Sequence, residues 1–154
     1  VIIWYLLFKT IIKENKSIFV NLPGYLKYLI IFISLALSVK FLLQLGSTAP
    51  AVSELAFGFR PIVIAYLHLI LLAIISLFLL FYVYTNDFVV INKKTTLGLF
   101  LFSLGVILNE VVLGIQGVAS LSYTLIPFIN ESLFGIAILL FASILWTTFF
   151  TKKG

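Results

Sequence analysis

The chain has 154 residues, of which 63% are hydrophobic and only 10% are charged. A soluble domain is about half apolar and about a quarter charged, so this composition excludes a water-soluble fold and indicates a protein that lies in lipid. The net charge of +5 does not indicate a nucleic-acid partner, because the lysines lie at the ends of apolar segments and Arg60 is the only arginine. Without cysteine, the chain has neither a disulfide framework nor a thiolate metal site.

Five apolar segments occur in chain order, at about 1–12, 25–46, 59–84, 96–116 and 128–150. A bilayer core takes roughly 20 apolar residues per helical crossing, and the last four segments reach that length. Continuous apolar runs such as residues 69–75 exclude the strands of a membrane barrel, which alternate over about 10 residues. We predict an all-α integral membrane helical bundle, a single domain over residues 1–154, with four complete transmembrane helices and the end of a fifth.

The first segment is apolar from its first residue and has no basic leader before it, so it is not a signal peptide. We interpret it as the end of a helix, and the chain as the C-terminal part of a larger protein. The expected partners of the bundle are therefore the lipid bilayer and the N-terminal helices of that parent protein.

The charges of the loops predict the orientation of the bundle. The loops at residues 47–57 and 117–127 contain no lysine or arginine, whereas the other two loops and the C-terminal tail are basic. Basic loops face the cytoplasm in membrane proteins. This pattern predicts a multi-pass protein with a cytoplasmic C-terminus, and we expect it in the inner (cytoplasmic) membrane of the cell. The lysines concerned are Lys13, Lys16, Lys27, Lys93, Lys94, Lys152 and Lys153.

Polar side chains inside the apolar segments gather in the half of the bundle that faces away from the cytoplasm. A charge facing lipid at mid-depth is costly, so these side chains should meet one another or water. Several lie at helical spacing from small residues, which are typical of helix–helix contacts. Simpler interpretations stay open: Lys40 snorkels to the headgroups, Arg60 anchors the interface and Glu131 is solvated. The predicted polar cluster consists of Lys40, Gln44, Arg60, Glu110 and Glu131.

Lys40 and Glu110 are the predicted pair within this cluster. The second and fourth segments run in the same direction, and each residue lies about 15 positions from the cytoplasmic start of its segment, which places the two at nearly the same depth. Pairing would avoid leaving either charge isolated in a medium of low dielectric constant. We predict a paired site, direct or bridged by water; the alternative is that Lys40 snorkels and Glu110 stays uncharged.

His68 is the only histidine and the sharpest candidate for a ligand. Imidazole is a common ligand of metals and of haem iron. The alternative is a hydrogen-bonded structural histidine, because a metal centre needs further ligands and the chain has no second histidine. His68 is therefore predicted as a cofactor-binding residue only where ligands come from elsewhere, with the metal itself unassigned.

The stretch from Glu54 to Leu69, in which Arg60 precedes the run Ile64-Ala65-Tyr66-Leu67-His68-Leu69, resembles a segment of a multi-pass membrane protein family of Bacteroidetes bacteria whose activity is undetermined. The preceding run from Lys40 to Gln44 is also similar to that family. The resemblance covers roughly residues 20–117. It implies a larger parent with a further histidine-bearing helical half. That family is loosely similar to haem–copper oxidase subunit I and to NnrS-type proteins, whose histidines bind haem or copper. Applied to this chain, the resemblance implies that His68 is its one haem or copper ligand.

Three functional interpretations follow. The favoured one is a multi-pass membrane protein with a polar cluster and no enzymatic activity, because no nucleotide-binding loop or catalytic arrangement occurs and no catalytic residue is assigned. The second is a haem- or copper-binding redox subunit with His68 as a ligand. The third is a proton-coupled transporter subunit in which Lys40, Glu110 and His68 line the route.

Overall fold

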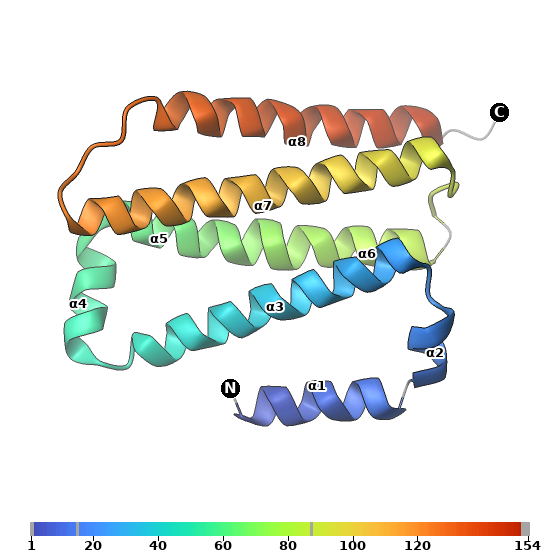
Figure 1. Cartoon of the computed structure of the whole chain (residues 1–154), viewed down its shortest axis with the longest axis horizontal. Helices are drawn as coiled ribbons and strands as arrows, with labels where there is room; N and C mark the ends of the chain where they lie inside the picture. The colour runs from blue at the N-terminus through green and yellow to red at the C-terminus, as the bar shows by residue number, and fades with distance from the viewer. Residues whose placement is uncertain (1, 15, 87, 152–154) are drawn as a thin grey trace.

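Helices form almost all of the chain in the computed structural model (Figure 1). The structure describes residues 2–14, 16–86 and 88–151, without the side chains of residues 12, 17–19 and 55–57. No strand occurs in these ranges, which confirms the predicted all-α class. The elements are α1 (Ile2–Glu14), α2 (Lys16–Asn21), α3 (Gly24–Gly46), α4 (Pro50–Gly58), α5 (Arg60–His68), the π-helix η1 (Leu69–Ser76), α6 (Leu77–Thr85), α7 (Lys93–Leu121) and α8 (Ile129–Thr151).

Four continuous helical stretches are long and apolar enough to cross a membrane: Gly24–Gly46, Arg60–Thr85, Lys93–Leu121 and Ile129–Thr151. They coincide with the four complete segments predicted from the sequence. Large apolar side chains on them face outward; Phe100 is 62% exposed and Phe141 is 67% exposed. Such a surface is stable in lipid and not in water. The protein is therefore a membrane-embedded helical bundle.

The α7 helix extends beyond its predicted range of 96–116 at both ends. At its start, the Asn92 side chain accepts hydrogen bonds from the backbone N–H groups of Lys94 and Thr95, and the Thr95 hydroxyl accepts one from the Asn92 N–H. This capping box fixes the first turn among polar residues that carry no hydropathy signal. The result is a helix about 43 Å long, which places Glu110 deeper than the predicted boundary implied.

The third span is not a uniform α-helix. Between α5 and α6, residues Leu69–Ser76 form the π-helix η1, which begins immediately after His68. The Ser76 hydroxyl donates a hydrogen bond to the carbonyl oxygen of Leu71, five residues earlier, at 2.8 Å. The unbroken apolar sequence predicts a helix here but does not indicate its hydrogen-bond register. Segments of π-helix occur frequently at functional sites.

The helices α4 and α1 are shorter than the four membrane-length stretches. The loop predicted at residues 47–57, which has no lysine or arginine, contains α4, which starts at Pro50, a residue suited to the first helical turn. At the other end of the chain, α1 packs against α3 through Trp4. The Trp4 indole N–H donates to the Ser38 hydroxyl at 3.1 Å, and its ring lies 5.7 Å from the ring of Phe41.

The interior of the bundle is built around α7, which packs against α8 and α5, while α3 packs against η1 and α6. Glycines allow α7 and α8 to approach closely. A Cβ atom at Gly98 would collide with the Thr147 hydroxyl, and one at Gly105 would lie 2.8 Å from Leu140 Cδ2. Small residues commonly permit this kind of helix contact in membranes.

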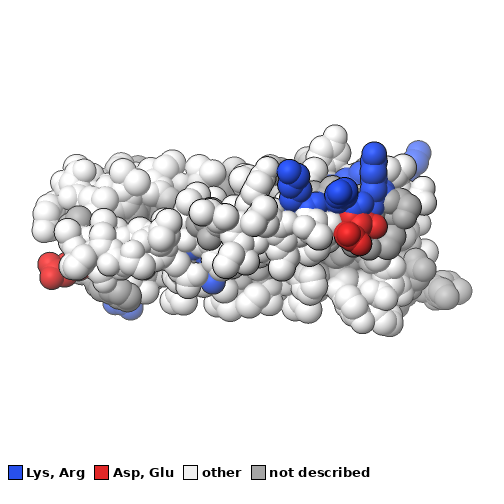
Figure 2. Space-filling view, turned by 90° about the horizontal axis from the view of Figure 1, so that it is seen from below, with Lys and Arg blue, Asp and Glu red and all other residues white. Residues whose placement is uncertain are grey.

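Charged residues gather at one end of the bundle. Figure 2 shows most of the basic surface, with acidic atoms beside it, at one end of a long body on which few other charged atoms are visible. We call this the lysine-rich end; it holds the starts of α3 and α7 and the end of α6 (Figure 1). The helix α4 lies at the opposite end, the α4 end. The predicted tail lysines Lys152 and Lys153 lie outside the described residues.

Candidate functional site

Three polar residues, His68, Asn109 and Glu110, lie at similar depth on α5 and α7, and we call them the polar site. The two helices are antiparallel, and a Cβ atom at Gly117 of α7 would lie 3.6 Å from Ile62 of α5. Six residues after Ile62 on α5 is His68, and six residues before Gly117 on α7 is position 111, next to Glu110. Because the helices are antiparallel, these two positions lie at the same level. Glu110 also lies two helical turns before Gly117, on the face of α7 that meets α5.

His68 has one nitrogen occupied and one open. Its Nδ1 lies 2.9 Å from the backbone carbonyl oxygen of Ile64, one turn earlier on α5. A carbonyl oxygen only accepts hydrogen bonds, so Nδ1 carries the proton in the neutral ring and Nε2 carries the lone pair. Among the described residues, Nε2 has no hydrogen-bond partner. It is therefore the atom of His68 that is available for a proton or a ligand.

Asn109 and Glu110 each present a buried polar atom without a partner. Asn109 is 7% exposed, and its amide nitrogen Nδ2 forms no hydrogen bond with any described residue. The same holds for Oε1 of Glu110 by hydrogen-bond geometry, although the carboxyl group interacts with the neighbouring Asn109 side chain and, more weakly, with His68. Leaving such a group unsatisfied costs about 1–3 kcal/mol, so its presence calls for an explanation. A donor amide, an acceptor oxygen and an open imidazole nitrogen together suit a proton, a water molecule or a small hydrogen-bonding solute.

The other predicted cluster members are not drawn into this site. Gln44, Arg60 and Glu131 are exposed. Lys40 is half-buried, and its ammonium group lies 4.7 Å from the centre of the Phe41 ring. No direct ion pair joins Lys40 to Glu110, both of which are described. Their predicted coupling through water stays a prediction.

The predicted depth relation between Lys40 and Glu110 agrees with the observed helices. Lys40 lies 16 residues after Gly24, the start of α3, and Glu110 lies 17 residues after Lys93, the start of α7. Both helices start at the lysine-rich end, so the two residues differ in depth by about 1.5 Å when the helices are parallel. Lys40 also continues the spacing of the buried α3 residues Ile33 and Ala36.

Sequence reasoning did not assign Asn109 to the site. The available signal was its position: it is an amide beside a carboxyl residue within an apolar helix. The π-helix after His68 gave no signal in the sequence at all.

The donor set of the described residues does not fit a metal centre. His68 supplies one open nitrogen, and no group of three or more histidine, aspartate, glutamate or cysteine side chains is placed to hold an ion in the described part of the chain. Copper sites need several nitrogen or sulfur ligands.

Comparison of the chain with protein-family models, with curated proteins and with solved structures finds no match. The resemblance to the Bacteroidetes family thus stays a prediction.

Proposed function

We propose that the protein is a proton-coupled transport subunit of the bacterial inner membrane, and that Glu110, His68 and Asn109 form its proton-binding site. The observation that carries the proposal is the buried Oε1 atom of Glu110, which has no hydrogen-bond partner among the described residues. Ionisable residues within membrane-spanning helices are rare and mark proton relays and solute pathways. A carboxyl group that only held helices together would be expected to have its oxygens satisfied.

The neighbours of Glu110 support a proton-exchange role. Imidazole and carboxyl groups are the side chains that most often take up and release protons in proteins. His68 interacts electrostatically with Glu110 and has an open Nε2. No direct hydrogen bond joins these two described side chains, so we propose them as a donor–acceptor couple that exchanges protons through water. The amide of Asn109 adds a neutral hydrogen-bond donor for a water molecule or the oxygen of a solute.

Apolar residues of α7 close the polar site on the side that faces the lysine-rich end. Toward the lysine-rich end, the inward residues Leu99, Phe102 and Val106 are apolar and buried. A proton that crosses the bundle therefore needs a movement at this level. The π-helix η1 starts directly after His68 and packs against α7, and a change in its register would turn His68 relative to α6. We place the movement in this segment.

The orientation proposal has the lysine-rich end in the cytoplasm, supported by the gathering of basic side chains there (Figure 2). The chain has no native cysteine, so single cysteines can be introduced without background. In membrane vesicles of known sidedness, Lys94→Cys should react with an impermeant maleimide only from the cytoplasmic side. Ser120→Cys should react only from the other side, and the reverse pattern would contradict the orientation.

Proton flux into liposomes tests the function. Purified full chain is reconstituted with a pH-sensitive dye inside, and a pH gradient with a compensating potassium potential is imposed. Glu110→Gln keeps the size of the side chain but removes the titratable group, and we expect it to lower the flux by about 100-fold. Glu131→Gln, at an exposed site in the first turn of α8, is the matched control and should leave the flux unchanged. Wild-type flux equal to that of empty liposomes, or full flux in Glu110→Gln, would refute the proposal.

A haem-binding or copper-binding role is the second candidate; because the donor set of this chain alone does not fit a metal centre, it requires further ligands from outside the described residues, and one observation favours it. The Nδ1–H of His68 is held by a backbone carbonyl, the arrangement that orients many metal-ligating histidines. A visible absorption spectrum of the purified protein tests it. A Soret or copper band that disappears in His68→Ala supports this candidate, and a colourless, metal-free protein removes it.

A further inference from the structure

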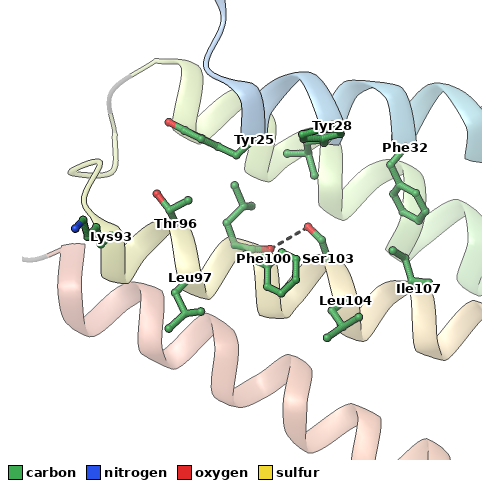
Figure 3. Close-up of a pocket in the computed structure, with 12 residues that line it drawn as sticks. Tyr25, Tyr28, Phe32, Lys93, Thr96, Leu97, Phe100, Ser103, Leu104 and Ile107 are labelled. Carbon is green, nitrogen blue, oxygen red and sulfur yellow. Dashed lines mark hydrogen bonds between the residues drawn. The ribbon is translucent and has the colours of Figure 1, made fainter.

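A groove of about 540 Å³ runs between the lysine-rich halves of α3 and α7, and we call it the α3–α7 groove (Figure 3). Tyr25, Tyr28, Leu29 and Phe32 line it from α3. On α7 the lining begins at Lys93 and ends at Ile107. Asn109 and Glu110 lie beyond its far end, so the groove is separate from the polar site.

The length of the groove matches one leaflet of a bilayer. The 15 residues from Lys93 to Ile107 span about 21 Å of helix, and Ile107 is the midpoint of α7. A bilayer is about 40–45 Å thick including its headgroup regions, so a lipid in one leaflet extends about 20–22 Å from the headgroup level to the midplane. The groove therefore runs from the headgroup level of the lysine-rich end to the middle of the membrane.

The lining has a charged end and an apolar body. Figure 3 shows Lys93 at one end of the groove and Phe32 with Ile107 at the other. Between them the walls are mostly apolar, and the Ser103 hydroxyl donates to the carbonyl oxygen of Leu99 on its own helix at 2.9 Å. A ligand with one anionic end and a long apolar body is complementary to this lining.

Lys93 differs from the lysines around it in having no partner. The ammonium group of Lys94 lies 4.3 Å from the centre of the Phe150 ring, and that of Lys27 donates to the carbonyl oxygen of Val20 at 2.9 Å. Lys93 is exposed and makes no such contact with any described residue. Its charge is thus available to an anion at the mouth of the groove.

A lipid is the occupant that this lining favours, because its anionic headgroup would meet Lys93 and its acyl chain would follow the apolar walls.

We propose that the α3–α7 groove binds a phospholipid with an anionic headgroup. The phosphate of the lipid pairs with the Lys93 ammonium at the membrane surface, and one acyl chain lies along the groove between Phe32 and Phe100. Lipid recognition by basic residues at this level is worth about fivefold in affinity per lysine. The proposal is independent of proton transport, because no residue of the polar site contributes to the groove.

Native mass spectrometry of the delipidated full chain in detergent tests the proposal. Phosphatidylglycerol and phosphatidylcholine with identical acyl chains are the probes. The wild-type chain should retain phosphatidylglycerol preferentially, and Lys93→Gln should lower that retention by about fivefold. Lys94→Gln removes an equal charge from the next residue, outside the groove, and should change it little. Ser103→Phe fills the groove and should lower the retention of both lipids, whereas Ala142→Phe, at an exposed position on α8, should not.

Three results would overturn the proposal. Equal retention of the two lipids by the wild-type chain removes the headgroup selectivity. Equal losses in Lys93→Gln and Lys94→Gln indicate a diffuse charge effect and not a site. Unchanged retention in Ser103→Phe places the lipid elsewhere. Lys93 is exposed, so its substitution leaves the packing of the bundle intact, and the first two results do not depend on the folding of Ser103→Phe.

Discussion

The two halves of α7 differ in whether the polar groups buried beside them form hydrogen bonds. Four polar residues are buried in the described part of the chain, and three of them serve the lysine-rich half. Thr95, Ser143 and Thr147 each donate a hydroxyl hydrogen bond to a backbone carbonyl within 3.0 Å. Asn109, in the other half, leaves Nδ2 without a partner, and Glu110 beside it leaves Oε1 without one.

Packing follows the same division. In the lysine-rich half, Gly98 and Gly105 bring α7 against Thr147 and Leu140 of α8 with no room for a Cβ atom. In the other half, a Cβ atom at Gly114 would meet nothing within 4 Å. A hydrogen bond between α8 and α7 at the lysine-rich end adds to the contrast: the Trp146 indole N–H donates to the carbonyl oxygen of Lys94 at 3.1 Å.

Along α7, the groups that stabilise the fold thus lie in one half, and the groups that we expect to serve activity lie in the other. Close packing and satisfied hydrogen bonds stabilise the lysine-rich half, because each satisfied buried group avoids a desolvation cost. Unsatisfied groups in the other half cost free energy, and proteins commonly retain such costs where activity requires them. We therefore expect mutations in the two halves to change stability with opposite signs.

The largest effect is expected from placing a larger side chain at the tight contact between α7 and α8. Gly98→Val places a branched side chain where the Thr147 hydroxyl and the Ser143 carbonyl oxygen already lie, so we expect the free energy of unfolding to fall by about 3 kcal/mol. Unfolding in mixed detergent micelles, followed by circular dichroism, measures it. Gly135→Val on α8 meets nothing within 4 Å and is the matched control. Equal losses in the two variants would show that the Gly98 contact is not a tight one.

A gain in stability is expected in the other half. Asn109→Leu replaces an unsatisfied amide with an apolar side chain of similar size, which should raise the free energy of unfolding by about 1–2 kcal/mol while lowering proton flux. Thr147→Val removes a satisfied hydroxyl and should lower stability by about 1 kcal/mol. If Asn109→Leu destabilises the protein as much as Thr147→Val does, the amide has a partner and the contrast between the two halves fails.

A smaller effect measures the coupling inside the polar site. A double-mutant cycle with His68→Phe and Glu110→Leu should show non-additivity of about 1 kcal/mol, because the two groups interact electrostatically. The measured quantity is again the free energy of unfolding in micelles. Additive effects would mean that the two side chains act separately, and the proposed donor–acceptor couple would then be wrong.

Composition and hydropathy predicted the fold because lipid imposes simple rules. Each crossing needs a long apolar helix, and the four predicted spans agree with the structure to within a few residues except at the ends of α7. The exceptions have local causes. Asn92 caps α7 through side-chain hydrogen bonds, and Pro50 starts α4 within a segment too short to cross.

The polar site was predicted only in part. Depth along a helix follows from counting residues, so the sequence placed His68 and Glu110 in the same half of the bundle. Which side chains meet depends on the rotation of each helix and on its register. The π-helix η1 changes that register without any mark in an apolar run, and Gln44 and Glu131 proved exposed despite their spacing from small residues.

The smallest expected effect concerns Lys40 and Glu110. They lie at nearly the same depth on parallel helices, and Lys40 continues the buried side of α3, but no direct ion pair joins them. A bridging water would still couple them weakly, since interactions are stronger where the dielectric constant is low. A double-mutant cycle with Lys40→Leu and Glu110→Leu should therefore give a coupling slightly above ~0.5 kcal/mol, smaller than that of His68 with Glu110. Lys40→Leu with Glu131→Leu, whose partner is exposed at the end of α8, provides the baseline for non-specific effects. A coupling no larger than this baseline would mean that Lys40 reaches toward the headgroups alone, and that Glu110 serves only the site it shares with His68.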